Sequence, residues 1–199
     1  MIVCETPRLR LRYLAEHDAA FILELLNEPE FIRNIGDREV RSLEDARRYI
    51  RSGTVTGYEK LGFGLYLVEL QEGATPIGLC GLLKRDYLDD VDVGFALRAG
   101  FRNQGFALEA ARAVMRYGRE VLGLGRIVAI TAPDNHASIK LLRRLGLQFE
   151  RNIRLPDVAR DTSLFTPSSG SPESVNPEDV QDEEQARAEQ RCTEQHADR

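Results

Sequence analysis

The residues from Val93 to Ala110 have the types and spacing to bind an anion. The apolar run that ends at Leu97 predicts a strand, a short loop follows, and a helix begins near Gly105. The first N–H groups of a helix have no partner within it, and the helix dipole adds partial positive charge there. Gly105 and Ala107 keep bulky side chains away from these N–H groups, and Arg102 adds a full charge. The segment therefore predicts an anion site that suits a pyrophosphate.

Taken alone, the pattern Arg-x-x-Gly-x-Ala is short enough to occur by chance, and a glycine before a helix is commonly only part of a turn. Two better-known nucleotide motifs are missing from the sequence. It contains no Gly-x-x-x-x-Gly-Lys-Ser/Thr phosphate loop and no Gly-x-Gly-x-x-Gly dinucleotide fingerprint. The identity of the anion must therefore be inferred from the surrounding elements.

The hydrophobic residues elsewhere follow the periods of strands and helices in turn. Their order predicts an α/β (α+β) fold, in which helices cover a mixed sheet of about seven strands. A Ser-x-x-Asp sequence opens the second helix as a capping box, and Gly146 ends the last one. Strands are predicted at 8–13, 63–70, 76–83, 91–97, 126–131, 147–153 and 160–165, and four main helices at 18–27, 42–52, 105–122 and 137–145.

The composition changes sharply after residue 166. Residues 167–199 contain nine acidic and three basic residues and no Leu, Ile, Phe, Tyr or Trp, so they bury too little apolar surface to offset chain entropy. We predict one folded domain over 1–166 and a disordered acidic C-terminal tail over 167–199. The domain is left with 24 basic and 23 acidic residues. This balance gives no reason to expect nucleic acid as a partner. An arginine-rich set that includes Arg8, Arg10 and Arg12 is interpreted as a solvated face.

Other classes are disfavoured as well. No apolar run approaches the roughly 18 residues of a membrane span, so no membrane partner is expected. The first residues lack the basic and apolar regions of a signal peptide. Cys4, Cys80 and Cys192 are too few and too widely spaced for a disulfide framework or a zinc site. We therefore expect a cytoplasmic protein without a metal.

The surrounding elements suggest which anion the segment binds, because the chain resembles the GNAT superfamily of N-acetyltransferases. Within that superfamily it is most similar to the ribosomal-protein acetyltransferases of the RimJ/RimL type. The resemblance covers about residues 5–166, and it implies the GNAT fold, with two splayed strands at the acyl-CoA site. It is carried by ordered blocks at Glu5–Arg12, Ser42–Ala46, Ile77–Gly81, Val91–Ala110, Gly125–Ile127, Asn135–Lys140 and Leu145–Leu147.

The resemblance implies acetyl-CoA as co-substrate and assigns residues to it. The backbone of the splayed strand, at Phe95, Ala96 and Leu97, would pair with the pantetheine arm. Asn135 and Ser138 would also contact CoA. The loop that would hold the pyrophosphate consists of Arg102, Asn103, Gln104, Gly105, Phe106 and Ala107.

Aminolysis of a thioester needs a neutral amine, a polarised carbonyl and a protonated leaving thiol. Asp92 is the candidate general base, because it occupies the position where the family often has Glu; a plain strand acid, another acid or a water is the alternative. Ser138 is the candidate proton donor to the thiol, with helix capping as its alternative. Many relatives have a Tyr seven residues after the Asn, but this chain has Leu142 there.

The acceptor is a primary amine by the same resemblance, and Arg33, Asp37 and Arg38 are expected to border its pocket. A protein N-terminus or a related amine is the first hypothesis. A small amine such as an antibiotic, a polyamine or an amino acid is the second, and a non-catalytic acyl-CoA-binding module is the third. Dimers are frequent in the family, so a homodimer is a further expectation.

Overall fold

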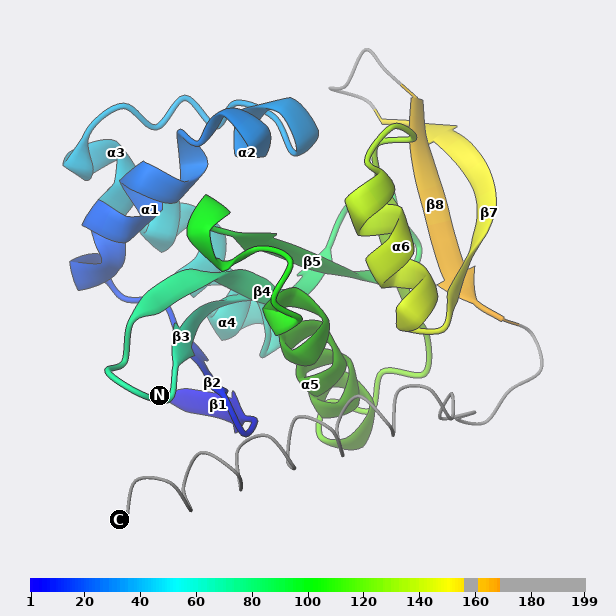
Figure 1. Ribbon diagram of the computed structural model, residues 1–199, viewed down its shortest axis with the longest axis horizontal. Coiled ribbons are helices and arrows are strands. Elements are labelled where there is room, and N and C mark those ends of the chain that lie inside the picture. Colours follow the sequence, from blue (N-terminus) through cyan, green and yellow to red (C-terminus); the bar gives the residue numbers. More distant parts are fainter. Residues whose placement is uncertain (156–160, 169–199) are drawn as a thin grey trace, which may run out of the picture. The chain divides into compact units, whose positions relative to one another are not determined.

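The computed structural model describes residues 1–155 and 161–168, and it contains a mixed sheet covered by helices (Figure 1). The described strands form one sheet in the order β1-β2-β3-β4-β5-β6-β8-β7. All neighbours are antiparallel except β5 and β6, which are parallel. The strands are β1 (Ile2–Glu5), β2 (Leu9–Tyr13), β3 (Leu65–Leu70), β4 (Pro76–Lys84), β5 (Val91–Leu97), β6 (Ile127–Thr131), β7 (Leu147–Arg154) and β8 (Asp161–Pro167).

Helices cover both faces of this sheet. In Figure 1, α1 (blue) and α3 (cyan) lie on one side of the strands and α5 (green) on the other, and two core clusters fill the two spaces. A π-helical stretch, Ile50–Val55, joins α3 to α4. The helices are α1 (Ala19–Leu26), α2 (Pro29–Asn34), α3 (Leu43–Tyr49), α4 (Thr56–Leu61), α5 (Phe106–Glu120) and α6 (His136–Arg144).

The fold class is confirmed, and the sequence prediction differs from the structure in its shortest elements. The described residues hold eight strands, not about seven, because β1 pairs with β2 as an edge strand. Its four residues are too few to show an alternating pattern. The six-residue helix α2 was missed for the same reason, although Pro29 at its first position is a helix-start signal.

Glycines in β4 fix how closely the central strands approach. A Cβ on Gly78 would lie 2.3 Å from the carbonyl oxygen of Ala96 in β5. A Cβ on Gly81 would lie 2.1 Å from the carbonyl oxygen of Gly64, just before β3. Real Cβ atoms do not approach backbone oxygens so closely. A larger residue at position 78 would therefore displace β5, the strand on which the site is built, and one at position 81 would displace the start of β3.

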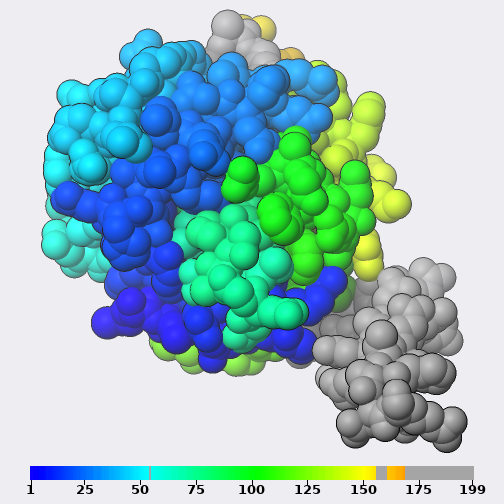
Figure 2. Space-filling model, turned by 60° about the vertical axis from the view of Figure 1, so that its left-hand side comes forward, coloured from blue at the N-terminus to red at the C-terminus, as the bar shows by residue number. Residues whose placement is uncertain are grey.

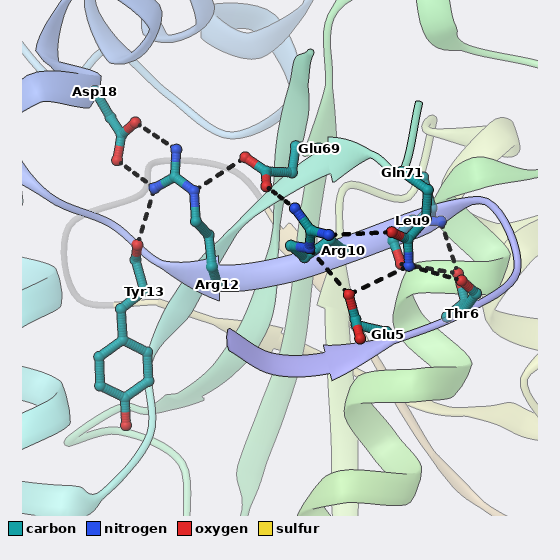
Figure 3. Close-up of polar contacts among 9 residues, drawn as sticks. All are labelled: Glu5, Thr6, Leu9, Arg10, Arg12, Tyr13, Asp18, Glu69 and Gln71. Atoms are coloured by element: carbon teal, nitrogen blue, oxygen red, sulfur yellow. Dashed lines mark hydrogen bonds and ion pairs between the residues drawn. The ribbon is translucent and has the colours of Figure 1, made fainter. Parts of the chain in front are cut away.

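The arginines of β2 do not form a simple solvated face; they form a ladder of ion pairs across the sheet (Figure 3). Arg12 binds both oxygens of Asp18, at 2.8 and 2.9 Å, and Glu69 at 3.0 Å. Arg10 bridges Glu69 and Glu5. The side chains of Asp18 and Glu69 are only 4% and 5% exposed. The interpretation as solvated arginines was therefore wrong for Arg10 and Arg12, because both pair with the buried carboxylate of Glu69, which must have a partner.

Asp18 should make acid stability depend on this ladder. Burial opposes its ionisation, but hydrogen bonds from Arg12 and from the Ala15 N–H outweigh burial and lower its pKa. An acid with a lowered pKa in the folded state stabilises the fold above its unfolded pKa, and this contribution is lost as the pH falls through the folded pKa. Asp18→Asn should therefore lower the free energy of unfolding near neutral pH by about 1–3 kcal/mol.

The deficit of Asp18→Asn should shrink as the pH falls below about 4, where the parent loses the same interaction. Urea unfolding across a pH series measures this change. Asp86→Asn is the matched control, because Asp86 is exposed. A deficit that stays constant into strong acid would show that Asp18 contributes through packing and not through its charge.

Candidate functional site

The site begins where two parallel strands part. β5 and β6 pair only at Val91 with Ile127 and at Asp92 with Val128. Beyond these pairs, β5 stays with β4 through Leu97, and β6 continues with β8 from Ala129. The edge of β5 that faces β6 therefore has no ladder partner at Phe95, Ala96 or Leu97 among the described strands. These are the three residues predicted to offer their backbone to a ligand.

The first turn of α5 borders this opening. Parallel strands end at the same edge of a sheet, so the helices that follow β5 and β6 both begin at the end where the two strands part. Gly105 caps α5 in the left-handed region at φ 81°, and Asn103 adopts φ 61°. The side chain of Phe106 is buried in the core, so this residue offers only its N–H to the loop. The N–H groups of Phe106, Ala107 and Leu108 precede the first internal hydrogen bond of the helix and are free to bind an anion.

Arg102, predicted to add its charge to the anion site, is held by the opposite flank. Its Nε donates to the Leu97 carbonyl at 2.9 Å, and its terminal nitrogens form ion pairs with Glu28 and Glu30. Glu28 also accepts from the Ala99 N–H at 3.2 Å. Figure 2 shows the result, with the blue surface of the α1–α2 region against the green surface of the β5–α5 connection. In this conformation two carboxylates compensate the charge of Arg102.

The second guanidinium at this loop was not predicted. Arg8 donates to Glu109 at 2.7 Å and to the Gln104 carbonyl at 3.1 Å, and it lies 4.4 Å from the centre of the Phe106 ring. Gln104 itself donates from its side chain to the Gly100 carbonyl at 2.9 Å. Arg8 is about a hundred residues away in the sequence, so only the fold could reveal that it braces the first turn of α5.

The helix after β6 places the other predicted ligand contacts. The Asn135 Oδ1 accepts from the Ser138 N–H at 3.1 Å and caps α6. Asn135 therefore uses its side-chain oxygen to cap the helix, and the Ser138 hydroxyl makes no hydrogen bond to any described residue. This hydroxyl is half-buried and available to a ligand.

Asp92 lies on the opposite face of β5 from α5, since its neighbours Val91 and Val93 pack into the α5 core. Its side chain is 1% exposed, and both oxygens accept from Arg85, at 2.7 and 3.2 Å. Burial raises the pKa of Asp92, and Arg85 acts against that rise. Arg85 was not predicted, although a hairpin that pairs Lys84 with Val91 brings the next residue, Arg85, beside Asp92.

The three residues expected at the acceptor pocket differ in their charge partners. Arg33 lies in α2 and is exposed. Asp37 is paired with Arg41, which lowers the pKa of Asp37. Arg38 is exposed, and its charge acts on the hydroxyl of Tyr49 at the end of α3. Tyr49 was not predicted, because it forms part of an ordinary helical stripe.

Comparisons with known proteins agree with this arrangement. A family model described as an acetyltransferase (GNAT) domain matches residues 8–148. A Bacillus subtilis protein named as an uncharacterized N-acetyltransferase, YoaA, is 31% identical over 154 residues, which cover 76% of this chain and 86% of that protein.

Solved structures share the fold. RimL, a ribosomal alpha-N-protein acetyltransferase in complex with coenzyme A, aligns with a TM-score of 0.73 and 19% identity, over 83% of this chain and 97% of RimL. An acetyltransferase from Agrobacterium tumefaciens aligns with a TM-score of 0.70 and 22% identity, over 83% and 93% of the two chains.

The chain belongs to the GNAT family of acetyltransferases, which take their acetyl group from acetyl-CoA. Within residues 1–155 and 161–168, no helix is long and apolar enough to cross a membrane. The same residues contain no group of three or more His, Cys, Asp or Glu that could hold a metal ion.

The first turn of α5 provides the sharpest test of cofactor binding. The melting temperature of the parent should rise with CoA or acetyl-CoA by mass action. Gly105→Glu should abolish this rise, because it adds bulk and negative charge beside the free N–H groups. Gly123→Glu is the matched control: Gly123 also has a positive φ, 67°, and a Cβ there meets nothing within 4 Å.

Thermal-shift measurements on the two variants should therefore separate local strain from ligand binding. Both substitutions strain the backbone, because each glycine has a positive φ. The quantity compared is therefore the rise in melting temperature on adding CoA and not the melting temperature of the free protein. Equal rises for the two variants would mean that CoA does not use this turn.

Proposed function

We propose that this chain transfers an acetyl group from acetyl-CoA directly to a primary amine, and that the amine is a protein N-terminus or a related amine. The observation that carries the proposal is the parting of β5 and β6 beside the open first turn of α5. It combines an unpaired strand edge, suited to an amide-containing arm, with N–H groups suited to a pyrophosphate.

The residues present fit acetyl-CoA. The backbone of Phe95, Ala96 and Leu97 would pair with its pantetheine arm, and the side-chain amide of Asn135 would make a further contact. A glycine at position 105 leaves room that a larger side chain would fill. The loop from Arg102 to Ala107 would hold the pyrophosphate, with Asn103, Gln104 and Phe106 contributing through the backbone.

Direct transfer without an acyl-enzyme is supported by the state of the thiols in the described residues. Burial raises the pKa of Cys80 well above its usual range and raises that of Cys4 to about 11. A thiol attacks as the thiolate, so neither is activated as a nucleophile. The bound acetyl-CoA supplies an activated acyl group, and the protein supplies position and proton transfer.

Two side chains are proposed for proton transfer. Asp92 would accept the proton of the amine, after Arg85 turns its guanidinium aside. The Ser138 hydroxyl would donate its proton to the leaving thiolate and regain one from solvent. This hydroxyl is free of the capping contact that Asn135 makes with the Ser138 N–H. Backbone N–H groups of β5 would polarise the carbonyl.

The nature of the amine is the finer part of the proposal. The likeness to RimL, named for acting on a ribosomal protein, favours a protein N-terminus. A small amine remains the second candidate, and a non-catalytic acyl-CoA-binding module the third. Location in the cytoplasm, a homodimer and a disordered tail also stay predictions, and residues 169–199 of that tail lie outside the described residues.

Turnover tests the function directly. Release of the CoA thiol from acetyl-CoA should depend on an added amine, and mass spectrometry should find the acetyl group on that amine. The panel contains peptides with free N-termini, the same peptides with blocked N-termini, and small amines. Tight acetyl-CoA binding with no transfer to any amine would favour the binding module instead.

Substitutions of the two proton-transfer residues should respond differently to pH. Asp92→Asn should lower kcat on the order of 10²-fold. That deficit should shrink as the pH rises towards the amine pKa of about 8, where neutral amine forms unaided. Ser138→Ala should lower kcat at every pH, and a thioester with a better leaving group than CoA should rescue it.

Both variants should still bind acetyl-CoA, because neither residue belongs to the pyrophosphate loop; a thermal-shift titration checks this. A pH-independent loss in Asp92→Asn, confined to KM for the amine, would show that Asp92 only anchors Arg85. Full activity of Ser138→Ala would assign the thiol proton to solvent.

A further inference from the structure

The turn between β1 and β2 is fastened to the start of α5. Thr6 closes this turn, because its N–H donates to the Leu9 carbonyl at 2.9 Å and its Oγ1 accepts from the Leu9 N–H at 3.0 Å. The Thr6 hydroxyl also donates to Glu109 in α5. Arg8, which lies inside the turn, is therefore held at a fixed place beside the helix.

Arg8 contacts the start of α5 with its backbone and its side chain. Its N–H donates to Glu109 Oε1 at 3.2 Å, and its Nε donates to Oε2 at 2.7 Å. Its Nη1 donates to the Gln104 carbonyl at 3.1 Å, and the guanidinium lies 4.4 Å from the centre of the Phe106 ring. A Cβ on Gly105 would lie 3.3 Å from Nη2. The guanidinium thus lies beside the loop that is proposed to hold the pyrophosphate.

The contacts of Arg8 leave donors unused. A guanidinium carries five N–H groups in a planar fork. Nε and Nη2 contact Glu109, and Nη1 donates to Gln104. One N–H on each terminal nitrogen has no acceptor within residues 1–155 and 161–168. The side chain of Arg8 is 48% exposed, whereas that of Glu109 is 18% exposed. The unused part of the fork is therefore accessible, and its orientation is already fixed.

Arg102, the other guanidinium of this loop, is in a different electrostatic state. Its terminal nitrogens form ion pairs with Glu28 and Glu30, so one positive charge faces two negative charges. A phosphate that approached Arg102 would meet both carboxylates. Arg8 is paired with Glu109 alone among the described residues. Arg8 can therefore bind a phosphate without giving up its ion pair.

We propose that Arg8 binds the pyrophosphate of acetyl-CoA with the two N–H groups that Glu109 and Gln104 leave unused. The inference rests on the proposed function, because it takes the first turn of α5 as the place of the pyrophosphate. The N–H groups of the helix and its dipole would orient the phosphates, and Arg8 would add charge-assisted hydrogen bonds. Glu109 is a positioning residue, since it fixes the fork.

Calorimetry with CoA tests the proposal without any need for turnover. Arg8→Gln should raise the Kd for CoA about tenfold or more in low salt. The difference between the parent and the variant should shrink as salt is added, because a partly exposed charge is screened. Arg119→Gln is the matched control, because Arg119 is exposed near the end of α5 and its loss changes the net charge equally. The control should bind CoA like the parent.

A double variant separates direct binding from an indirect effect of Glu109. Arg8→Gln alone leaves the Glu109 carboxylate without its ion pair near the phosphates, and repulsion could then weaken binding. Arg8→Gln with Glu109→Gln removes both charges. The double variant should still bind CoA about fivefold or more weakly than the parent, with the same dependence on salt. A double variant with the affinity of the parent would show that Arg8 only neutralises Glu109, and would overturn the proposal.

A shortened ligand identifies the phosphate that Arg8 binds. Dephospho-CoA keeps the pyrophosphate and lacks the 3′-phosphate of CoA. Arg8→Gln should weaken the binding of both ligands by the same factor. A loss that disappears with dephospho-CoA would assign Arg8 to the 3′-phosphate and overturn its assignment to the pyrophosphate.

The remaining outcomes separate this inference from the proposed function. An equal Kd for the parent and Arg8→Gln would overturn the role of Arg8 and leave acetyl transfer standing. A loss that does not change with salt would also overturn it, because Arg8 would then only shape the loop. A parent that binds neither CoA nor acetyl-CoA would overturn the proposed function, and the inference with it.

Discussion

Two parallel strands that pair at only two positions leave peptide groups that must find other partners. Each N–H or C=O buried without one would cost about 1–3 kcal/mol, so the unpaired edge of β5 must stay open to water or to a ligand. β5 can tolerate this because its other edge is fully paired. Seven residues of β5 are in register with β4, and Gly78 admits the Ala96 carbonyl at a distance that no larger residue would allow. Because the edge of β5 that faces β4 is fully paired, the edge that faces β6 can stay unpaired.

The chain connects the two halves of the site through one acidic segment. Glu28 and Glu30 hold Arg102 in the loop before α5, and Glu24 pairs with Arg98 at 3.2 Å. The residues that follow, from Arg33 to Arg38, include those proposed to border the acceptor pocket. The loop proposed for the cofactor and the segment before that pocket are therefore fastened to each other by ion pairs.

The periodic elements and the glycine-capped start of α5 could be predicted from the sequence, because both depend on residues that are close together along the chain. Alternation along Leu9–Tyr13 and the glycine at position 105 are local signals. Most partners of the site residues are not local. Arg102 is compensated by Glu28, and the first turn of α5 is braced by Arg8; each contact joins residues that only the fold brings together. The Arg85 partner of Asp92 is closer in sequence, but it depends on the register of the β4–β5 hairpin. Short elements such as β1 were not predicted for a different reason, since four residues are too few to show an alternation of apolar and polar side chains.

The pair formed by Arg85 and Asp92 is costly as a purely structural device. Taking two charges out of water costs several kcal/mol per ion by typical estimates, and a well-packed apolar pair of similar volume is often as stable or more so. The pair is also asymmetric, with a carboxylate that is 1% exposed and a guanidinium that is 25% exposed. Tyr87 accepts a further hydrogen bond from the same guanidinium. Burial raises the pKa of Asp92, and buried acids with a shifted pKa are common at functional sites. The pair is therefore better explained by the proton transfer proposed for Asp92 than by stability.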